Sequence, residues 1–201
     1  MRRNSQLMLV GENVMLLPYK RHMVPKYHEW MKSPELLHLT ASEPLSLEEE
    51  FEMQRKWLED DDKCTFIIID LALFNEEQDE IGSMIGDTNL FFMPKEDNDG
   101  LCTAEAEIMI AESSARRKRR GWEAIILMLL YGILELKVQK YQAKIGVNNS
   151  ASIQMFTNLG FKEESISDVF QEVTLLRTVD EDWSHWLQEQ TKMRITPYDH
   201  D

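Results

Sequence analysis

The chain has 201 residues, 43% of them hydrophobic, and a formal net charge of −14 at pH 7. That length and apolar content are sufficient for one well-packed core, so we expect a single domain over residues 1–201. A charge this negative argues against nucleic acid and anionic membrane surfaces as partners, and it is compatible with a cationic substrate.

The sequence indicates neither a metal site nor a membrane segment. Cys64 and Cys102 form no CxxC pattern, and the five histidines have no metal-binding spacing, so we predict no metal. Residues 1–13 lack the apolar core of a signal peptide, and the longest apolar stretch, 124–134, is shorter than the ~20 residues of a membrane span. We therefore expect a cytoplasmic protein with free thiols.

The first part of the chain predicts one strand and two helices. Residues 14–18 are a short apolar run closed by a proline, which is typical of a strand. Apolar residues recur at helical spacing over 22–31, and a second helical stretch over 46–59 begins with a capping box formed by Ser46 and Glu49. The glutamates in the first turn of this second helix are expected to be mostly solvated.

The middle of the chain predicts three strands. Runs of strand-forming residues bounded by turn residues lie at 64–70, 83–92 and 102–111. The stretch between the first two runs is rich in turn residues. Residues 94–100, PKEDNDG, have the composition of a turn between two paired strands.

Beyond residue 120 the pattern changes. Residues 122–136 are continuously apolar and contain no proline, which predicts a largely buried helix. A strand is expected at 141–147, followed by a helix at 149–159 that ends at Gly160, because a left-handed C-cap favours glycine. The last strand is expected at 170–177.

The order of these elements defines the expected fold class. A strand, two helices, three strands, a helix, a strand, a helix and a final strand make an α/β domain with a mixed sheet. We expect the core at about 14–176. The polar tail 177–201, which carries Trp183 and Trp186, is expected to cap the domain.

Five consecutive cations stand immediately before Gly121 and the buried helix. A helix N-terminus presents unpaired N–H groups and a partial positive charge, so phosphate oxygens bind there, and nearby guanidinium groups add charge-assisted bonds. A polybasic surface or nuclear-localisation run is about equally supported by charge alone. A membrane-surface switch is less favoured, because the following helix is apolar all round. The cations are Arg116, Arg117, Lys118, Arg119 and Arg120.

The context of this loop resembles a known family. Residues 105–124 (EAEIMIAESSARRKRRGWEA), with 148–161 (NNSASIQMFTNLGF), resemble the GNAT superfamily of N-acetyltransferases, in its ribosomal-protein-alanine acetyltransferase branch. In that superfamily's acetyl-CoA loop, R/Q-x-x-G-x-G/A, Arg116 takes the first position and Gly121 the last. The resemblance runs over about 14–176 and is strongest to the N-acetyltransferase 9 family, in segments such as YHEWMKSPEL and VFQEVTL.

This resemblance implies a GNAT fold with acetyl-CoA as co-substrate. The fold is a mixed, mostly antiparallel sheet of six to seven strands, splayed at the acetyl-CoA site and flanked by about four helices. Acetyl-CoA would lie between the strands 105–111 and 141–147, with its pantetheine paired to strand backbone in the manner of an added strand. The backbone of that strand is contributed by Ile108, Met109 and Ile110.

The remaining cofactor contacts follow from the same resemblance. The pyrophosphate would bind N–H groups from Arg117 to Trp122, while Asn149 and Ser152 would hydrogen-bond the pantetheine arm or hold the following helix. For Asn149 a helix N-cap is an equally supported role. Ser152 is also compatible with a polar surface position.

The chain departs from the motif at Arg119, which replaces the middle glycine. If this position has a positive φ, a non-glycine residue there is strained by about 1–2 kcal/mol. Weakened acetyl-CoA binding would follow, and the extra cations would offset part of the loss.

Glu105 and Glu107 are the candidate proton acceptors for the chemistry. Alternation along the strand places both on one face, opposite Ala106, and a carboxylate can take a proton from a substrate amine. We expect Glu105 to matter more than Glu107. The alternative for each is the solvent-exposed face of a half-buried strand.

The resemblance thus implies an acetyl-CoA-dependent enzyme that acetylates protein N-terminal amines, those of α- and β-tubulin, without a covalent acyl-enzyme. The absence of a GxSxG elbow agrees with direct transfer. The alternative is a catalytically weak or inactive GNAT-fold scaffold that binds a protein partner such as microtubules. The filled glycine position at Arg119 is the main feature that favours the scaffold.

Overall fold

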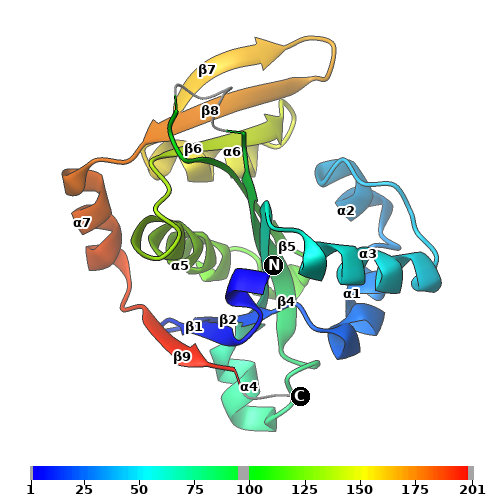
Figure 1. Cartoon of the computed structure of the whole chain (residues 1–201). Helices are drawn as coiled ribbons and strands as arrows, with labels where there is room; N and C mark the ends of the chain where they lie inside the picture. Colours follow the sequence, from blue (N-terminus) through cyan, green and yellow to red (C-terminus); the bar gives the residue numbers. More distant parts are fainter. Residues whose placement is uncertain (1, 95–99, 199–201) are drawn as a thin grey trace.

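A nine-stranded sheet runs through residues 2–94 and 100–198, which are the residues that the computed structural model describes (Figure 1). The strands are β1 Leu7–Val10, β2 Val14–Pro18, β3 Lys63–Asp70, β4 Met84–Phe92, β5 Thr103–Ile110, β6 Lys140–Gly146, β7 Lys162–Ser167, β8 Glu172–Thr178 and β9 Arg194–Pro197. Their order across the sheet is β7-β8-β6-β5-β4-β3-β2-β1-β9. All neighbours are antiparallel except β5 and β6, which are parallel.

Seven α-helices in the described residues cover the two faces of the sheet. They are α1 Val24–Trp30, α2 Pro34–Leu39, α3 Leu47–Glu59, α4 Leu71–Glu77, α5 Arg120–Leu134, α6 Ser150–Asn158 and α7 Glu181–Gln190. Helices α5, α6 and α7 lie on one side, and α1, α2 and α3 lie on the other (Figure 1). None of the described helices is both long and apolar enough to cross a membrane.

Two hydrophobic clusters follow from this arrangement. The larger one lies between α5 and the sheet, and it includes the fully buried residues Ile125 to Leu129 of α5 together with Trp183 and Leu187 of α7. The smaller one is formed by α1, α2 and the opposite face of β2, β3 and β4. Because α5 is buried over most of its circumference, it is apolar on nearly all sides, as the sequence predicts.

A buried carboxylate fixes the start of α5. Glu123, in the first turn, accepts hydrogen bonds from the backbone N–H groups of Glu12 and Asn13, the Asn13 side chain and the Thr191 hydroxyl. These donors belong to the β1–β2 turn and the segment after α7. The N-terminus of α5 is therefore anchored to both ends of the chain.

The expected α/β fold with a mixed, mostly antiparallel sheet is confirmed, but the described residues form nine strands and seven α-helices, more than the six to seven strands and about four helices expected. The predicted strands and helices correspond to β2, β3, β4, β5, β6, β8, α1, α3, α5 and α6. Gly160 has the left-handed conformation expected of it, with φ 90°. The turn predicted at 94–100 falls largely on residues 95–99, which lie outside the described residues.

Several short elements escaped the sequence patterns. Helix α2 is a single short segment capped by Ser33, and α4 is capped by the Asp70 carboxylate, which accepts from the Ala72 and Leu73 N–H groups. Strand β7 reads KEESIS and has no apolar alternation. The tail beyond 177 does more than cap the domain, because α7 packs on α5 and β9 pairs with β1 at the sheet edge.

The capping box of α3 is confirmed, but one glutamate of its first turn is buried. Ser46 and Glu49 exchange the two expected hydrogen bonds. Glu50 was expected to be solvated, yet it is buried between α3 and α1, where its Oε1 lies 3.9 Å from Nδ1 of His28. Helical spacing turns Glu50 inward, and burial raises the pKa of its carboxyl to about 7.

This burial predicts a pH-dependent stability. The folded-state pKa of Glu50 lies above the ordinary value of 4.5, so folding favours the protonated form, and stability falls as the pH rises from about 4.5 to about 7. We expect Glu50→Gln to be more stable than the parent at pH 8 and close to it at pH 5, measured by urea unfolding. Glu48→Gln, at an exposed position, should behave like the parent at both pH values. Equal urea midpoints for Glu50→Gln and the parent at pH 8 would contradict the assignment.

Candidate active site

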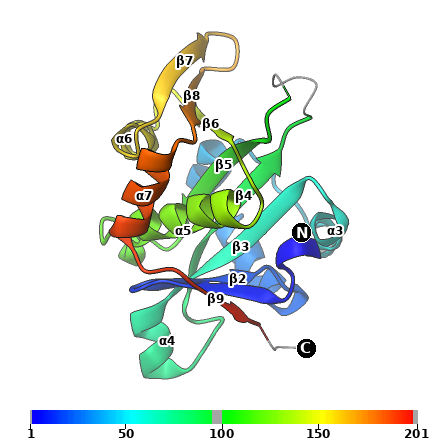
Figure 2. The ribbon, with the colours of Figure 1, turned by 60° about the vertical axis from the view of Figure 1, so that its left-hand side comes forward.

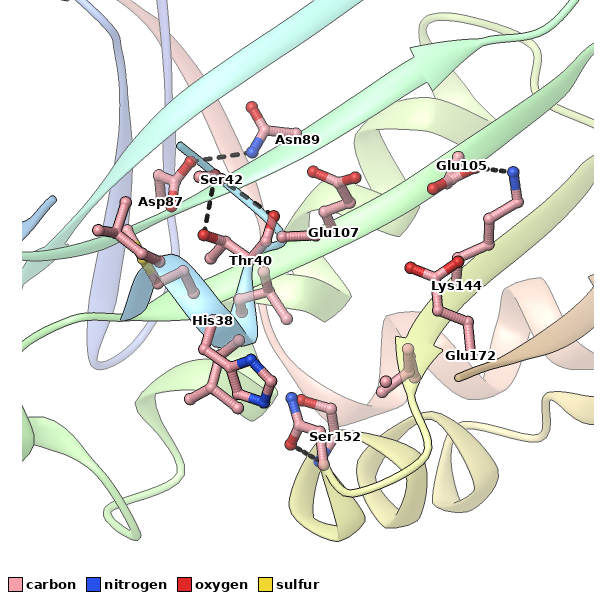
Figure 3. Close-up of a pocket in the computed structure, with 18 of the residues that line it drawn as sticks. His38, Thr40, Ser42, Asp87, Asn89, Glu105, Glu107, Lys144, Ser152 and Glu172 are labelled. Carbon is pink, nitrogen blue, oxygen red and sulfur yellow. Dashed lines mark hydrogen bonds and ion pairs between the residues drawn. The ribbon is translucent and has the colours of Figure 1, made fainter. Parts of the chain in front are cut away.

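The site begins where two parallel strands stop pairing. Strands β5 and β6 pair only over Thr103–Glu105 and Lys140–Gln142, and they diverge beyond these residues. A cavity of about 1060 Å³ lies at this divergence, lined by β3, β4, β5 and β6, by the end of α2, by the start of α6 and by the β7–β8 turn (Figure 3). The splay expected between strands 105–111 and 141–147 is therefore present in the geometry.

Strand register places polar side chains in rows on the cavity floor. Residues paired across neighbouring strands share a face, and each row contains one residue from β3, one from β4 and one from β5. The alternate residues of β5, such as Ala104 and Ala106, pack on the opposite side in the larger cluster. The rows are Lys63–Phe91–Glu105, Thr65–Asn89–Glu107 and Ile67–Asp87–Met109.

Glu107 stands on the cavity floor with its carboxylate open to the cavity (Figure 3). The side chain is exposed to solvent inside the cavity, yet the surrounding walls withdraw it from bulk water. This burial, together with the nearby Glu105 carboxylate, raises the pKa of Glu107 to about 7, while Lys63 acts in the opposite direction. A carboxylate in this state can both accept and release a proton near neutral pH.

Glu105 lies in a different environment on the same face. Its Oε2 accepts a hydrogen bond from Gln142 Nε2 at 2.7 Å and lies 3.5 Å from Lys144 Nζ. Both partners come from β6: Gln142 is opposite Glu105 in the last pair that β5 and β6 form, and Lys144 lies two residues beyond it. Glu105 therefore links β5 to β6 at the point where the two strands begin to diverge. Figure 3 shows its ion pair with Lys144.

A hydrogen-bonded chain runs beneath these carboxylates. The Thr65 hydroxyl donates to Asn89 Oδ1 at 2.6 Å, and Asn89 Nδ2 donates to Asp87 Oδ2 at 2.9 Å. Burial raises the pKa of Asp87 to about 6, although hydrogen bonds from Asn89 and Tyr27 favour its charged form. These bonds hold the Asp87 carboxylate in one position in the cavity wall.

The opposite wall of the cavity comes from α6 and the segment before it. Asn149 is the N-cap of α6, since its side chain accepts from the Ser152 N–H at 3.2 Å. Both residues line the cavity, beside Phe156. The helix-capping role considered for Asn149 is thus present, and Ser152 is placed to face the cavity as well (Figure 3).

The loop before α5 has the backbone conformation that makes glycine favourable. Arg119 is the N-cap of α5 with φ 61°, and Arg117 has φ 59°. Arg119 thus occupies a left-handed position at the site of the missing motif glycine. The strain anticipated for a positive φ, about 1–2 kcal/mol, applies to this residue.

The five cations of this loop fall into two groups. Arg116 Nε donates to the Ile110 carbonyl at 2.9 Å, and its Nη1 pairs with Glu35 of α2 at 2.9 Å. Arg120 pairs with Asp70 at 2.8 Å. The guanidinium groups of these two residues are therefore occupied by protein partners. The exposed residues of the run are Arg117, Lys118 and Arg119.

The first turn of α5 packs closely on β5. A Cβ added at Gly121 would lie 3.1 Å from Ile110 Cγ1, so a larger residue here would require the Ile110 side chain to shift. The ring of Trp122 packs edge-to-face against Trp186, and the Arg119 guanidinium lies 5.7 Å from the Trp122 ring. The side chain of Trp122 thus serves for packing beside the loop. Its backbone N–H is one of the unpaired groups of the first helical turn.

Sequence reasoning missed the cavity residues that come from β3, β4 and α1. Lys63, Asp87 and Tyr27 have no shared spacing, because only strand register and helix packing bring them together. The available signal was the polar run Asp87 to Asn89 within an otherwise apolar strand. Within residues 2–94 and 100–198, no three His, Cys, Asp or Glu side chains are grouped so as to hold a metal ion.

Comparison with known proteins assigns the family. Residues 13–162 match the family described as Acetyltransferase (GNAT) domain. This match covers well over half of the chain. The chain therefore belongs to the GNAT acetyltransferase family and is an enzyme of the N-acetyltransferase class.

The resemblance to N-acetyltransferase 9 proteins is also confirmed. The chain is 48% identical over 197 residues to Alpha/beta-tubulin-N-acetyltransferase 9 of Drosophila melanogaster, in a match that covers 97% of this chain and 98% of that protein. It is 50% identical over 194 residues to the Homo sapiens protein of the same name, with 95% and 92% covered.

Solved structures support the same fold. Spermidine N-acetyltransferase from Vibrio cholerae, in complex with CoA and spermine, superposes with a TM-score of 0.66 at 21% identity and covers 90% of this chain and 99% of its own. A ribosomal L7/L12 alpha-N-protein acetyltransferase in complex with coenzyme A gives 0.68 at 13% identity, covering 85% and 97%. At these identities the likeness concerns the fold alone.

The left-handed conformation of Arg119 predicts the effect of restoring glycine. We expect Arg119→Gly to raise the free energy of unfolding by about 0.5–1 kcal/mol, because glycine adopts this φ without strain from a Cβ, and its greater flexibility in the unfolded chain offsets part of the gain. Arg119→Ala, which retains the strained φ, should bring no gain. Urea unfolding of both variants checks this, and indistinguishable midpoints for Gly and Ala would contradict it.

Proposed function

We propose that this chain is an acetyl-CoA-dependent N-acetyltransferase that acetylates protein N-terminal amines by direct transfer. The observation that carries the proposal is the cavity at the β5–β6 divergence, which brings the unpaired edge of β5 and the carboxylate of Glu107 into one space. The edge suits an amide-rich cofactor arm, and the carboxylate suits an amine.

The cofactor would follow the route set by these elements. Its pantetheine would pair with β5 backbone between Ile108 and Ile110, in the manner of an added strand, and its pyrophosphate would bind the N–H groups at the start of α5. The exposed cations Arg117, Lys118 and Arg119 would add attraction for the phosphates. Arg116 and Arg120 would act by holding the loop, since both are already paired.

The transfer itself needs one proton acceptor. The substrate amine attacks the thioester carbonyl, a C–N bond forms, the C–S bond breaks, and CoA leaves as a thiolate. Glu107 would accept the amine proton, directly or through a water molecule. It is better suited than Glu105, which is engaged by Gln142 and Lys144, so we propose the reverse of the order expected from sequence.

The cavity walls favour a cationic protein segment. Glu105, Glu107, Asp87 and Glu172 all line the cavity, so their combined charge attracts an ammonium group. At the mouth, the β7–β8 turn carries Val169 and Phe170, which are 86% and 75% exposed. Exposed apolar side chains beside a cavity suit contact with residues downstream of the acetylated terminus.

The names of the relatives suggest α- and β-tubulin as the substrates and hence a cytoplasmic location for the reaction. The second candidate is a scaffold of the same fold that binds a protein partner such as microtubules without turnover. The strained Arg119 favours this second candidate, whereas the open carboxylate of Glu107 favours the enzyme. Turnover of acetyl-CoA with an N-terminal peptide of tubulin separates the two.

Glu107→Gln is expected to lower kcat for such a peptide by about 10²–10⁴-fold, because the amide cannot accept the proton. Glu105→Gln should cause a smaller loss. In the parent, kcat/KM should rise with pH through about 7, since Glu107 must be deprotonated to act. Steady-state kinetics over pH 5.5–9 (roughly one to two units on either side of the pKa) provide the measurement.

The controls concern binding. Both glutamate variants should bind acetyl-CoA with the parent's Kd by calorimetry. Gly121→Glu should abolish binding, since it places bulk and negative charge where the pyrophosphate would meet the helix. A loss of kcat below about threefold in both glutamate variants would remove these carboxylates from the mechanism.

The turn of the β7–β8 hairpin should affect only long substrates. We expect the double change Val169→Ser and Phe170→Ser to raise KM about thirtyfold for an N-terminal peptide of about ten residues, because two lost apolar contacts of about 1 kcal/mol each weaken binding by about 2 kcal/mol. The KM for a dipeptide amide should not change. Leu73→Ser on α4, an exposed apolar residue far from the hairpin (Figures 1 and 2), is the matched control. An equal effect on both peptides would contradict the contact.

A further inference from the structure

Lys63 is a buried cation in the cavity wall and forms no ion pair with any carboxylate of residues 2–94 and 100–198. The residue is 6% exposed, and its Nζ lies 3.0 Å from the ring centroid of Trp57 and 4.1 Å from that of Phe91. The ion pairs found among the described residues do not include it. The two aromatic rings therefore hold the ammonium group by cation–π attraction.

Such a lysine lowers the stability of the fold. Burial lowers the pKa of Lys63 to about 7, so the unfolded chain binds the proton more tightly than the folded one. The loss of stability is complete below pH 7 and disappears as the pH rises towards the ordinary lysine value. A methionine of similar length would fill the same space without this desolvation penalty. The packing of the cavity wall alone therefore does not explain a cation here.

The position of Lys63 couples it to the catalytic carboxylate. Its row on the cavity floor, Lys63–Phe91–Glu105, is adjacent to the row that contains Glu107. The positive charge lowers the pKa of Glu107 and that of Asp87, against the opposing effects of burial and of neighbouring carboxylates. In a cavity of restricted polarity, such a charge acts over several ångströms.

We propose that Lys63 is a positioning residue for acetyl transfer, because its ammonium, fixed on Trp57 and Phe91, keeps the Glu107 carboxylate ionised and able to accept the substrate's proton. The inference rests on the proposed function. In this scheme Glu107 accepts the proton of the substrate amine, and Lys63 keeps Glu107 in the charged form that can accept it.

Other charged groups also face Glu107 and enter the pH dependence. The carboxylates of Glu105 and Asp87 raise the pKa of Glu107, which opposes the effect of Lys63. Lys144, on β6, lowers the pKa of Glu107 as Lys63 does. Lys63 and Glu107 therefore titrate as a coupled set rather than one by one. The titratable groups that line the cavity around Glu107 are Glu105 on β5, Asp87 on β4, Lys63 on β3, Lys144 on β6, Tyr27 on α1, His38 on α2 and Glu172 on β8.

The test compares Lys63→Met with Lys63→Arg over the full pH profile of kcat/KM. Met removes the charge and keeps the length, so the acidic limb should move to higher pH by about half a unit or more, with about threefold lower activity well below the limb. Arg retains the charge and should leave this limb in place. Lys144→Met is the matched control, because it removes a more exposed cation paired to Glu105, and its shift should be smaller.

Two measurements separate this role from a structural one. Lys63→Met should unfold at a higher temperature than the parent at pH 7, so a fall in activity cannot come from instability. Carbon-detected NMR of Glu107 in the protein alone should show the same upward pKa shift in Lys63→Met. This titration needs no turnover, so a shift with no acetylation of any peptide would refute the proposed function and support the coupling.

Two outcomes would overturn the inference. If the Glu107 titration is the same in the parent and in Lys63→Met, the charge of Lys63 does not set the acceptor's ionisation. If Lys63→Arg loses as much activity as Lys63→Met at every pH, Lys63 acts through its own neutral amine, and the positioning role is wrong.

Discussion

The early end of pairing between β5 and β6 is the constraint on which the rest of the site depends. After three residue pairs the strands separate, and the β6 side of β5 is left without a strand partner from Ala106 to Ile110. Buried backbone N–H and C=O groups require partners, so such an edge is stable only beside solvent or a ligand. The cavity supplies that solvent. The same divergence exposes the face of β5 that carries Glu105 and Glu107.

The segments that border this opening are tied to one another by charged pairs. Arg116 joins the loop before α5 to Glu35 of α2, and Arg120 joins it to Asp70 at the start of α4. Glu112, just before this loop, accepts from Trp30 Nε1 and pairs with Lys26. Helices α1 and α2 and the loop before α5 are therefore connected by these contacts. Within the basic run, Arg116 and Arg120 therefore hold these segments together, whereas Arg117, Lys118 and Arg119 remain exposed.

The floor of the cavity contains three ionisable side chains, Lys63, Asp87 and Glu107, whose charged forms are disfavoured by burial. Asp87 and Glu107 have raised pKa values because burial disfavours their charged forms, and Lys63 has a lowered one for the same reason. The positive charge of Lys63 makes ionisation of Asp87 and Glu107 less unfavourable, whereas the Asp87 and Glu105 carboxylates make ionisation of Glu107 more unfavourable. Perturbed groups of this kind concentrate at catalytic sites, where a proton must move near neutral pH.

The sequence by itself determined the main helices and strands, and it located the two candidate glutamates and the basic loop of the site. Apolar periodicity located α5 and the central strands, the capping box marked the start of α3, and alternation put Glu105 and Glu107 on one face. These are local properties, decided within a few residues of chain. The motif around Gly121 likewise marked the loop where Arg119 is strained.

Only the tertiary structure decided which of the two glutamates is free and what surrounds it. Gln142 and Lys144 reach Glu105 from β6, whereas Lys63, Asp87 and Tyr27 approach Glu107 from three other elements. Strand register sets these contacts, and register depends on pairing between distant segments. For the same reason, the tail after 177 showed no sign in its sequence of completing the sheet. Its strand β9 needs β1 as a partner, and its helix α7 needs the surface of α5.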